Sequence, residues 1–235
     1  MLPTVAILCG GRGTRLQTSA QALPKPLVEI GGRPILWHVV QIYLTQGFRR
    51  FLLLTGHRAE QVAAFVAATE WPAGTAITCL DTGIDTPTGG RVHRARAALT
   101  GERFCLTYAD GVADIDLAAL LGAHVAAGIA ATMTVVRPEL PFGVAQLGPG
   151  DRIDGFTEKP RSEHWVNGGF FCLEPEIFDV LSAEATLERA PLSALASSGR
   201  LRAHRHDGFW ACVDTYKDQV ALNDLCNAGT PPWLR

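Results

Sequence analysis

Lysine is rare in this sequence, and two of its three lysines stand beside prolines. The chain has 18 arginines among its 21 basic residues, with lysine only at Lys25, Lys159 and Lys217. The first two occur in the tripeptides PKP and EKP. An ammonium group is a compact charge that can sit against one phosphate oxygen, whereas guanidinium is a wide fork. We therefore expect Lys25 and Lys159 to contact phosphate groups.

A glycine-rich stretch, CGGRGTRLQTSAQALPKP at residues 9–26, follows the first strand-like run. Its glycines let backbone N–H groups approach negative oxygens, and Arg12 and Arg15 add charge. It is not a P-loop, because the GxxxxGK[ST] spacing is absent. It is also a poor dinucleotide fingerprint, because Leu16 stands at the third glycine position. The stretch predicts a locally built site for the phosphates of a nucleotide.

Two aspartates follow apolar runs and precede small polar or glycine positions. Asp110 comes after FCLTY, and Asp214 comes after the run in GFWACV. Carboxylates at strand ends can hold Mg²⁺, which prefers one or two carboxylates together with water and substrate phosphates. Alone, each aspartate is more often a helix cap or turn residue than a metal ligand, and we expect Asp114, Asp116 and Asp218 to be caps.

Two separated lysines and a metal site favour a reaction between two phosphorylated substrates. Such a transfer depends on positioning and charge neutralisation more than on a nucleophilic side chain. No Ser-His-Asp or Cys-His arrangement competes with this interpretation. His204 and His206 share a strand face without nearby Cys or His partners, so we assign no zinc.

The composition is typical of a folded protein and gives no excess of positive charge. The 235 residues are 47% hydrophobic and 19% charged, with a net charge of −2 and a pI near 6.4. These values argue against nucleic-acid or anionic-membrane binding, and no apolar run has the length of a membrane span. Without a signal-peptide pattern at MLPTVAILCGG, we expect a cytoplasmic protein. The six cysteines form no CxxC pair and are expected to be reduced core residues.

Strand-like and helix-like segments alternate through residues 1–136, the rhythm of a parallel sheet with crossover helices. Strands are expected at 4–8, 51–55, 77–80, 104–108 and 131–136, and helices at 34–46, 59–68, 90–99 and 116–127. Beyond Pro138 we expect a hairpin around Gly148–Asp151, a strand at 165–173, short helices at 175–181 and 191–198, a strand at 202–206 and a last helix at 216–227. The prediction is one α/β domain with a Rossmann-like mixed sheet flanked by helices and an elaborated C-terminal half.

The ordered motifs resemble the sugar-1-phosphate nucleotidylyltransferases. GGRGTRL followed by PKPLVEIGGRPILWH is similar to their nucleotide-binding signature. DTGIDTPTGGRV, YADGVADID, FGVAQL, EKP, VNGGFF and GFWACVDT resemble in particular the glucose-1-phosphate cytidylyltransferases, and the resemblance runs to the C-terminal PPWLR. It implies a fold of the nucleotide-diphospho-sugar transferase type. It also implies a reaction of CTP with a sugar 1-phosphate, giving a CDP-sugar and pyrophosphate without a covalent enzyme intermediate.

The resemblance also implies roles for individual residues. Residues 1–136 would mainly bind the nucleotide, and 137–235 would mainly bind the sugar phosphate and metal. Arg15, Lys25 and Asp110 are the implied catalytic residues, with Mg²⁺ on Asp110 and Asp214. The implied nucleotide-binding residues are Gly10, Gly11, Gly13, Thr14, Arg15, Lys25, Gly83, Gly89 and Arg91. The implied sugar-phosphate-binding residues are Gly143, Glu158, Lys159, Asn167 and Gly168.

The sequence departs from the family pattern at a few places, and some alternatives stay open. Ala109 replaces an expected glycine, Leu23 replaces an expected lysine, and the segment at residues 69–75 is short. A homo-oligomer is expected, although the short segment bears on its form. Open alternatives are another base (UTP, dTTP or GTP), another sugar such as a heptose, and a catalytically silent nucleotide-binding regulator. A Rossmann oxidoreductase explains neither PKP nor EKP.

Overall fold

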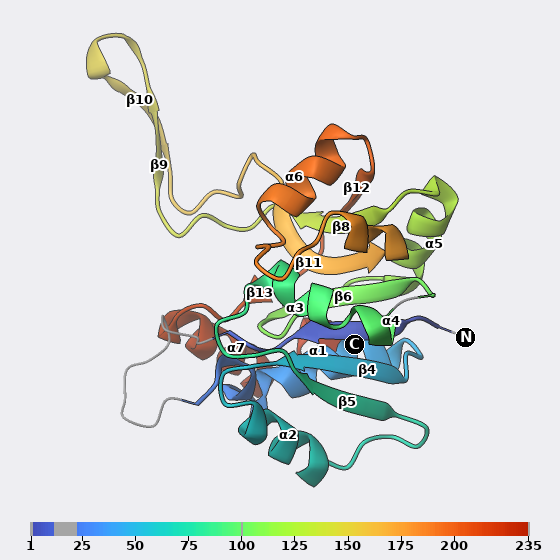
Figure 1. The fold of residues 1–235 in the computed structure, drawn as a ribbon. Coiled ribbons are helices and arrows are strands. Elements are labelled where there is room, and N and C mark those ends of the chain that lie inside the picture. The colour runs from blue at the N-terminus through green and yellow to red at the C-terminus, as the bar shows by residue number, and fades with distance from the viewer. Residues whose placement is uncertain (1, 12–22, 100, 235) are drawn as a thin grey trace.

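A computed structural model describes residues 2–11, 23–99 and 101–234, and one seven-stranded sheet runs through this part of the chain (Figure 1). Its spatial order is β12-β8-β11-β6-β1-β4-β5. The strands are β1 (Thr4–Leu8), β4 (Arg50–Thr55), β5 (Ala76–Asp81), β6 (Phe104–Tyr108), β8 (Ala131–Val136), β11 (Val166–Leu173) and β12 (Leu201–Arg205). Only β11 runs antiparallel to its neighbours in this sheet. The predicted α/β fold with a mixed sheet is confirmed.

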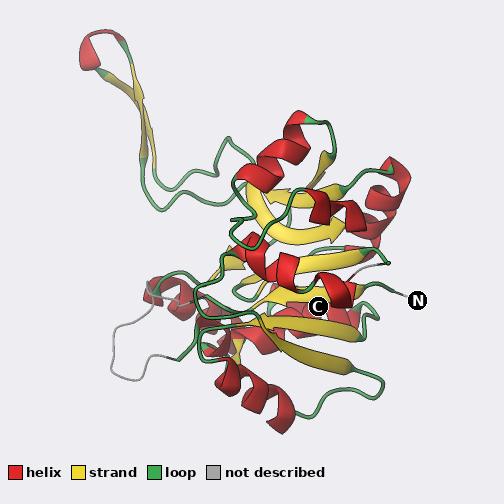
Figure 2. Ribbon diagram, in the orientation of Figure 1, coloured by secondary structure: helices red, strands yellow, loops and turns green. Residues whose placement is uncertain are grey.

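Helices cover both faces of the sheet (Figure 2). The helices are α1 (Ile35–Thr45), α2 (Ala59–Ala68), α3 (Thr88–Arg94), α4 (Arg96–Leu99), α5 (Leu117–Ala127), α6 (Ala190–Ser197) and α7 (Tyr216–Asn227), with 3-10 turns η2 (Lys25–Leu27), η3 (Pro149–Asp151), η4 (Pro175–Asp179) and η5 (Pro232–Leu234). Alternate β1 residues point to opposite faces. Val5 and Ile7 pack with α1, α5 and α7, whereas Ala6 and Leu8 pack with α3, α4 and α6. The central strands are therefore buried on both sides.

Three two-stranded sheets accompany the main one. They pair β2 (Glu29–Ile30) with β3 (Arg33–Pro34), β7 (Gly111–Ala113) with β13 (Trp210–Cys212), and β9 (Val144–Leu147) with β10 (Ile153–Thr157). The β9–β10 hairpin is the one predicted around Gly148–Asp151. It projects from the body as a long arm (Figure 1) and does not add strands to the main sheet.

Two local expectations from the sequence are wrong. The helix expected over 90–99 is divided into α3 and α4 at Ala95, whose N–H is shared between the carbonyls of Arg91 and Val92 at 3.2 and 3.1 Å. Asp114 is not a cap, because its Oδ1 lies 3.0 Å from His206 Nε2. Asp116 does cap α5 by accepting from the Ala119 N–H.

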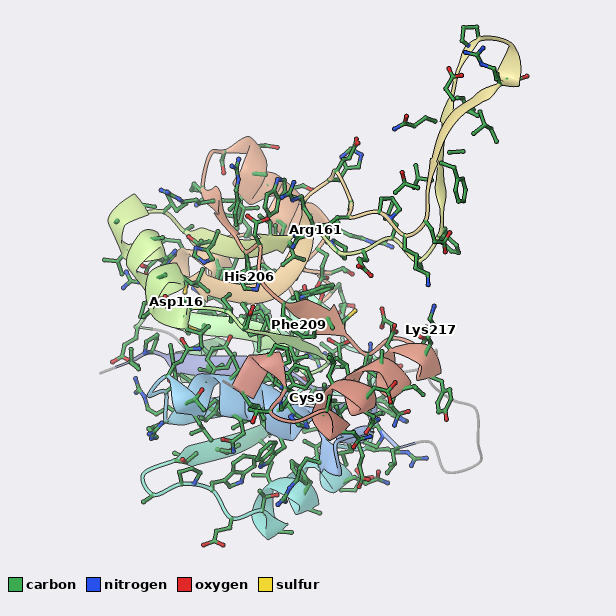
Figure 3. The ribbon with its side chains drawn as sticks, turned by 180° about the vertical axis from the view of Figure 1, so that it is seen from behind. Cys9, Asp116, Arg161, His206, Phe209 and Lys217 are labelled. Atoms are coloured by element: carbon green, nitrogen blue, oxygen red, sulfur yellow. The ribbon has the colours of Figure 1, made fainter. Side chains whose placement is uncertain are left out.

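The capping of α5 and α7 otherwise follows the expectation. The Asp116 to Ala119 hydrogen bond measures 2.8 Å, and Figure 3 shows Asp116 at the start of α5. Asp218 and Thr215 form a capping box at the start of α7, in which each side chain accepts from the backbone of the other. Among the described residues, no helix has the length and apolar character needed to cross a membrane. The six cysteines are free thiols, and Cys9, Cys105 and Cys172 are buried.

A wide bulge interrupts β11. Asn167 stands opposite Val135 and Phe171 opposite Met133, so residues 168–170 face Thr134 alone on β8. Gly169 and Phe170 both have left-handed backbone, with φ of 76° and 48°. Such a φ costs a non-glycine residue about 1–3 kcal/mol. Phe170 is fully buried and its ring stacks on Tyr43, with ring centroids 6.0 Å apart, which offsets the strain.

Candidate functional site

A cavity of about 400 Å³ opens at the carboxyl ends of β1 and β6. Ligands of open α/β sheets bind at this edge. The glycines after β1, the residues after β6 and the start of α3 line the cavity, together with residues from far along the chain. Its polar lining includes Gly10, Gly11, Lys25, Thr88, Arg91, Tyr108, Asp110 and Asp214.

Lys25 bridges the two aspartates at the cavity. Its Nζ lies 2.5 Å from Asp110 Oδ2 and also donates to Asp214 Oδ1. The side chains of Lys25, Asp110 and Asp214 are 17%, 29% and 40% exposed. Burial alone would lower the pKa of Lys25, but the charges and hydrogen bonds of Asp110 and Asp214 outweigh it and raise that pKa. Lys25 therefore stays charged between the two carboxylates.

The two prolines beside Lys25 place it at the cavity. Pro24 precedes the 3-10 turn η2, and Pro26 lies within it, so both backbone φ angles are constrained. The Leu27 N–H donates to the Pro24 carbonyl at 2.8 Å, and Leu27 packs into the core. The turn is thus held on the core side while Lys25 faces the aspartates.

The β7–β13 ladder brings the two aspartates together. Gly111 pairs with Cys212, and the Val213 N–H donates to the Asp110 carbonyl at 2.9 Å. Asp214 therefore emerges beside Asp110. Its own N–H donates to Asp218 Oδ2 at 3.0 Å, which ties it to the capping box of α7.

Arg91 is a buried cation whose hydrogen bonds join three strand ends. It is 4% exposed, and burial lowers its pKa. Nη1 donates to Thr55 O (2.9 Å), Thr82 Oγ1 (2.7 Å) and Gly83 O (2.8 Å), and Nη2 donates to Gly10 O (2.9 Å) and Ile84 O (3.3 Å). A Cβ on Gly10 would lie 2.0 Å from Arg91 Cζ, so only glycine fits there. Arg91 therefore holds the start of the loop after β1 through its hydrogen bond to the Gly10 carbonyl.

The other expected nucleotide-binding residues fall into two groups. Gly83 and Gly89 lie on the segment from β5 to α3, on the same side as Arg91, but they do not line the cavity. Gly13, Thr14 and Arg15, with Arg12, lie outside the described residues.

The expected sugar-phosphate residues lie on two other segments. Gly143, Glu158 and Lys159 are at the base of the β9–β10 hairpin, where a Cβ on Gly143 would meet Glu158 Oε2 at 2.9 Å. Arg161 lies where the hairpin meets the body (Figure 3). Asn167 and Gly168 are at the β11 bulge, where Trp210 Nε1 donates to the Gly168 carbonyl at 2.8 Å. These five residues do not line the 400 Å³ cavity.

A hydrogen-bonded chain that the sequence did not suggest links the cavity to the bulge. Tyr108 lines the cavity, and its hydroxyl accepts from Asn167 Nδ2 at 3.0 Å. The same hydroxyl donates to Glu188 Oε1, and Thr88 donates to Glu188 Oε2, both at 2.6 Å. Tyr108 lies in the YAD motif that marked Asp110, but Glu188 stands in a segment with no recognisable pattern.

The carboxylate oxygens of Asp110 and Asp214, which now contact Lys25, suit a divalent cation. Oxygens of Asp110 and Asp214 already share one cation, the Lys25 ammonium, so they are close enough to share another. Two carboxylates with open access to substrate oxygens are typical of Mg²⁺ sites. Within the described residues no group of three or more His, Cys, Asp or Glu side chains could hold a metal, so the remaining ligands would be water and substrate.

Comparisons with known proteins agree over nearly the whole chain. Residues 4–210 match the family described as nucleotidyl transferase. The "Probable glucose-1-phosphate cytidylyltransferase" of Bacillus subtilis (strain 168) is 39% identical, and the "Glucose-1-phosphate cytidylyltransferase" of Salmonella typhimurium is 37% identical, each with 97% of both chains covered. The crystal structure of HddC from Yersinia pseudotuberculosis complexed with GMP-PN superimposes with a TM-score of 0.74, 18% identity, and 95% and 99% coverage. That last likeness concerns the fold.

Proposed function

The chain belongs to the nucleotidyl transferase family, and we propose that it transfers a cytidylyl group from CTP to α-D-glucose 1-phosphate, giving CDP-glucose and pyrophosphate. The single observation that carries the reaction class is the Lys25, Asp110 and Asp214 cluster at the mouth of the sheet. The choice of base and sugar rests on the similarity to two proteins named glucose-1-phosphate cytidylyltransferase over 97% of the chain.

The proposed reaction exchanges one phosphorus–oxygen bond for another. A phosphate oxygen of the sugar 1-phosphate attacks the α-phosphorus of CTP in line. The bond from that phosphorus to the oxygen bridging to the β-phosphorus breaks, and pyrophosphate leaves with the electron pair. Anionic oxygens approach one another in this step, so the protein mainly has to position the substrates and neutralise charge.

Lys25 and the two aspartates supply the charges at the reacting centre. Asp110 and Asp214 would hold Mg²⁺, which supplies charge neutralisation to the phosphate oxygens when bound. Lys25 is expected to turn from the carboxylates to the phosphates around the α-phosphorus when the nucleotide enters. Arg15 is the third proposed catalytic residue.

The remaining roles divide between the two halves of the chain. Residues 1–136 mainly bind the nucleotide, and residues 137–235 mainly bind the sugar phosphate and metal. The proposed triphosphate cradle is Gly10, Gly11, Gly13, Thr14 and Arg15, with Gly83, Gly89 and Arg91 in the wall beside the base and ribose. The proposed sugar-phosphate contacts are Gly143, Glu158, Lys159, Asn167 and Gly168.

A nucleotide and sugar panel tests this function. The purified protein is incubated with Mg²⁺, glucose 1-phosphate and CTP, UTP, dTTP or GTP in turn, and pyrophosphate release is measured. CTP is expected to give the highest kcat/KM. Faster turnover with UTP, dTTP or GTP would sink the cytidylyl assignment.

Two further arms address the remaining alternatives. Replacing glucose 1-phosphate by a heptose 1-phosphate tests the sugar, and higher kcat/KM with the heptose would reassign it. CTP binding without turnover on any sugar phosphate would identify a silent regulator.

We also propose that the chain forms a homo-oligomer through the β9–β10 hairpin. An isolated two-stranded hairpin is marginally stable in water. The side chains of Phe142, Leu147 and Phe156 are 74%, 70% and 66% exposed on or beside this arm, which favours a covered state. Light scattering after gel filtration should give an oligomer for the wild type and a smaller species for Leu147→Lys with Phe156→Lys. A monomeric wild type would contradict this proposal.

A further inference from the structure

We propose that Glu188 is a positioning residue that couples two walls: the nucleotide wall, which is the start of α3 at the cavity, and the sugar wall, which is Tyr108 with Asn167 of the proposed sugar site; this inference rests on the proposed function. Glu188 stands just before α6, and each of its carboxylate oxygens accepts a hydrogen bond from a different wall. Oε1 accepts from the Tyr108 hydroxyl and Oε2 accepts from the Thr88 hydroxyl, both at 2.6 Å. A carboxylate can accept at both oxygens at once, which no neutral side chain of that size does.

The Tyr108 arm leads to the proposed sugar site. The phenol has one hydrogen, which it gives to Glu188, so its lone pair is left to accept from Asn167 Nδ2 at 3.0 Å. Asn167 Oδ1 accepts from the Gly169 N–H at 2.9 Å. Both ends of the Asn167 amide are thereby oriented, while its second N–H hydrogen is left for a ligand hydroxyl. Burial, and then the Glu188 charge, raise the pKa of Tyr108, so the phenol remains a donor.

The Thr88 arm leads to the proposed nucleotide site. Thr88 is the first residue of α3, the helix that carries Arg91, and residues 86–88 line the cavity. The Thr88 hydroxyl also accepts from the Leu187 N–H at 3.0 Å, and the Gly90 N–H donates to the Ala185 carbonyl at 2.9 Å. The segment 185–188 is therefore bonded to the start of α3 at several points. Moving Glu188 would move both walls.

The negative charge of Glu188 argues against a direct role in phosphate binding. Both proposed substrates are anionic, so a carboxylate beside their cavity repels the phosphates and interacts favourably with hydroxyl donors. In the structure both Glu188 contacts are to neutral hydroxyls. Glu188 therefore acts on the substrates through Tyr108 and Thr88, and not by direct contact with the reacting atoms.

Three near-isosteric variants separate the two arms. We expect the loss of one such hydrogen bond to weaken ligand positioning by up to about tenfold, the factor that corresponds to the free energy of one hydrogen bond to a charged acceptor. Tyr108→Phe is expected to raise KM for glucose 1-phosphate by about that factor and to change KM for CTP less than twofold. Thr88→Val is expected to do the reverse. Glu188→Gln is expected to raise both KM values, and Glu188→Gln combined with Tyr108→Phe should not weaken sugar binding beyond the worse single variant.

The matched control is Glu184→Gln, an exposed glutamate four residues earlier in the same segment. It is expected to leave both KM values unchanged, and thermal melting of every variant checks its folding. Titration calorimetry of CTP and of glucose 1-phosphate, each added separately, reports the same split without turnover.

The outcomes distinguish this inference from the proposed function. An inactive wild type would remove the cytidylyl assignment, whereas an active wild type with Glu188→Gln unchanged in both KM values would overturn the coupling alone. Additive effects of Glu188→Gln and Tyr108→Phe on sugar binding would also overturn it, because they would mean that Glu188 contacts the sugar independently of Tyr108.

Discussion

Replacing Arg91 by lysine is expected to destabilise the folded protein by about 2–3 kcal/mol. The guanidinium uses two nitrogens to serve five acceptors, four of which are backbone carbonyls. A lysine has a single nitrogen with three hydrogens, so at least two acceptors lose their donor. A buried acceptor left unsatisfied costs about 1 kcal/mol or more, and the stronger hydration of ammonium adds to the cost of burial.

Equilibrium urea unfolding followed by tryptophan fluorescence measures this change, since the chain has five tryptophans. Arg94→Lys is the matched control. Arg94 lies one helical turn later and is exposed, with a hydrogen bond from Nη1 to the Thr82 carbonyl at 2.5 Å. Its replacement should cost less than about 1 kcal/mol.

The ligand-free state is the informative one for Arg91. The five hydrogen bonds of the guanidinium go to protein acceptors, so the loss should appear before any nucleotide is added. A change below about 0.5 kcal/mol, within the range of ordinary surface substitutions, would refute the conclusion that Arg91 holds the strand ends together.

Two other predictions concern the reacting centre and the core. Asp110→Asn should lower the rate of pyrophosphate release by about 100-fold or more at saturating Mg²⁺, and near-wild-type turnover would exclude Asp110 as an essential ligand. Burial lowers the pKa of His38, whose Nε2 donates to the Ile30 carbonyl at 2.8 Å while Nδ1 accepts from Trp233 at 3.2 Å. Protonation thus favours the unfolded chain, and the free energy of unfolding should fall as pH drops below about 6.5. Urea titrations from pH 7.5 to 5.5 should show a steeper fall for the wild type than for His38→Gln, and parallel curves would contradict this.

The sequence predicted most of the regular elements because their signals are local. The run Thr4–Leu8 is a strand, and Ala59–Ala68 and Tyr216–Asn227 are helices at the expected bounds. The division of α3 from α4 has no such signal, because neither Gly nor Pro stands at Ala95. The three-residue strands β7 and β13 are too short to show alternation, although their pairing sets the distance between the two aspartates.

Contacts between side chains far apart in the sequence limited how much of the site could be predicted. The sequence suggested that Lys25, Asp110 and Asp214 all serve one centre, but not that the lysine contacts both aspartates directly. Lys25 and Asp214 are 189 positions apart, and only the assembled sheet joins them. Asp114 looked like a cap because caps are common after strands, whereas its partner His206 follows the distant strand β12.

The bulge in β11 has a consequence for how this enzyme family can diverge. Phe171–Leu173 pair with both β6 and β8, whereas Val166 and Asn167 keep a separate register against β8 alone. The strand therefore behaves as two modules: one pairs with the scaffold on both sides, and the other carries Asn167, a proposed sugar contact. A mutation that alters Asn167 need not shift the scaffold pairs, so new sugar preferences can evolve at this end without remaking the sheet.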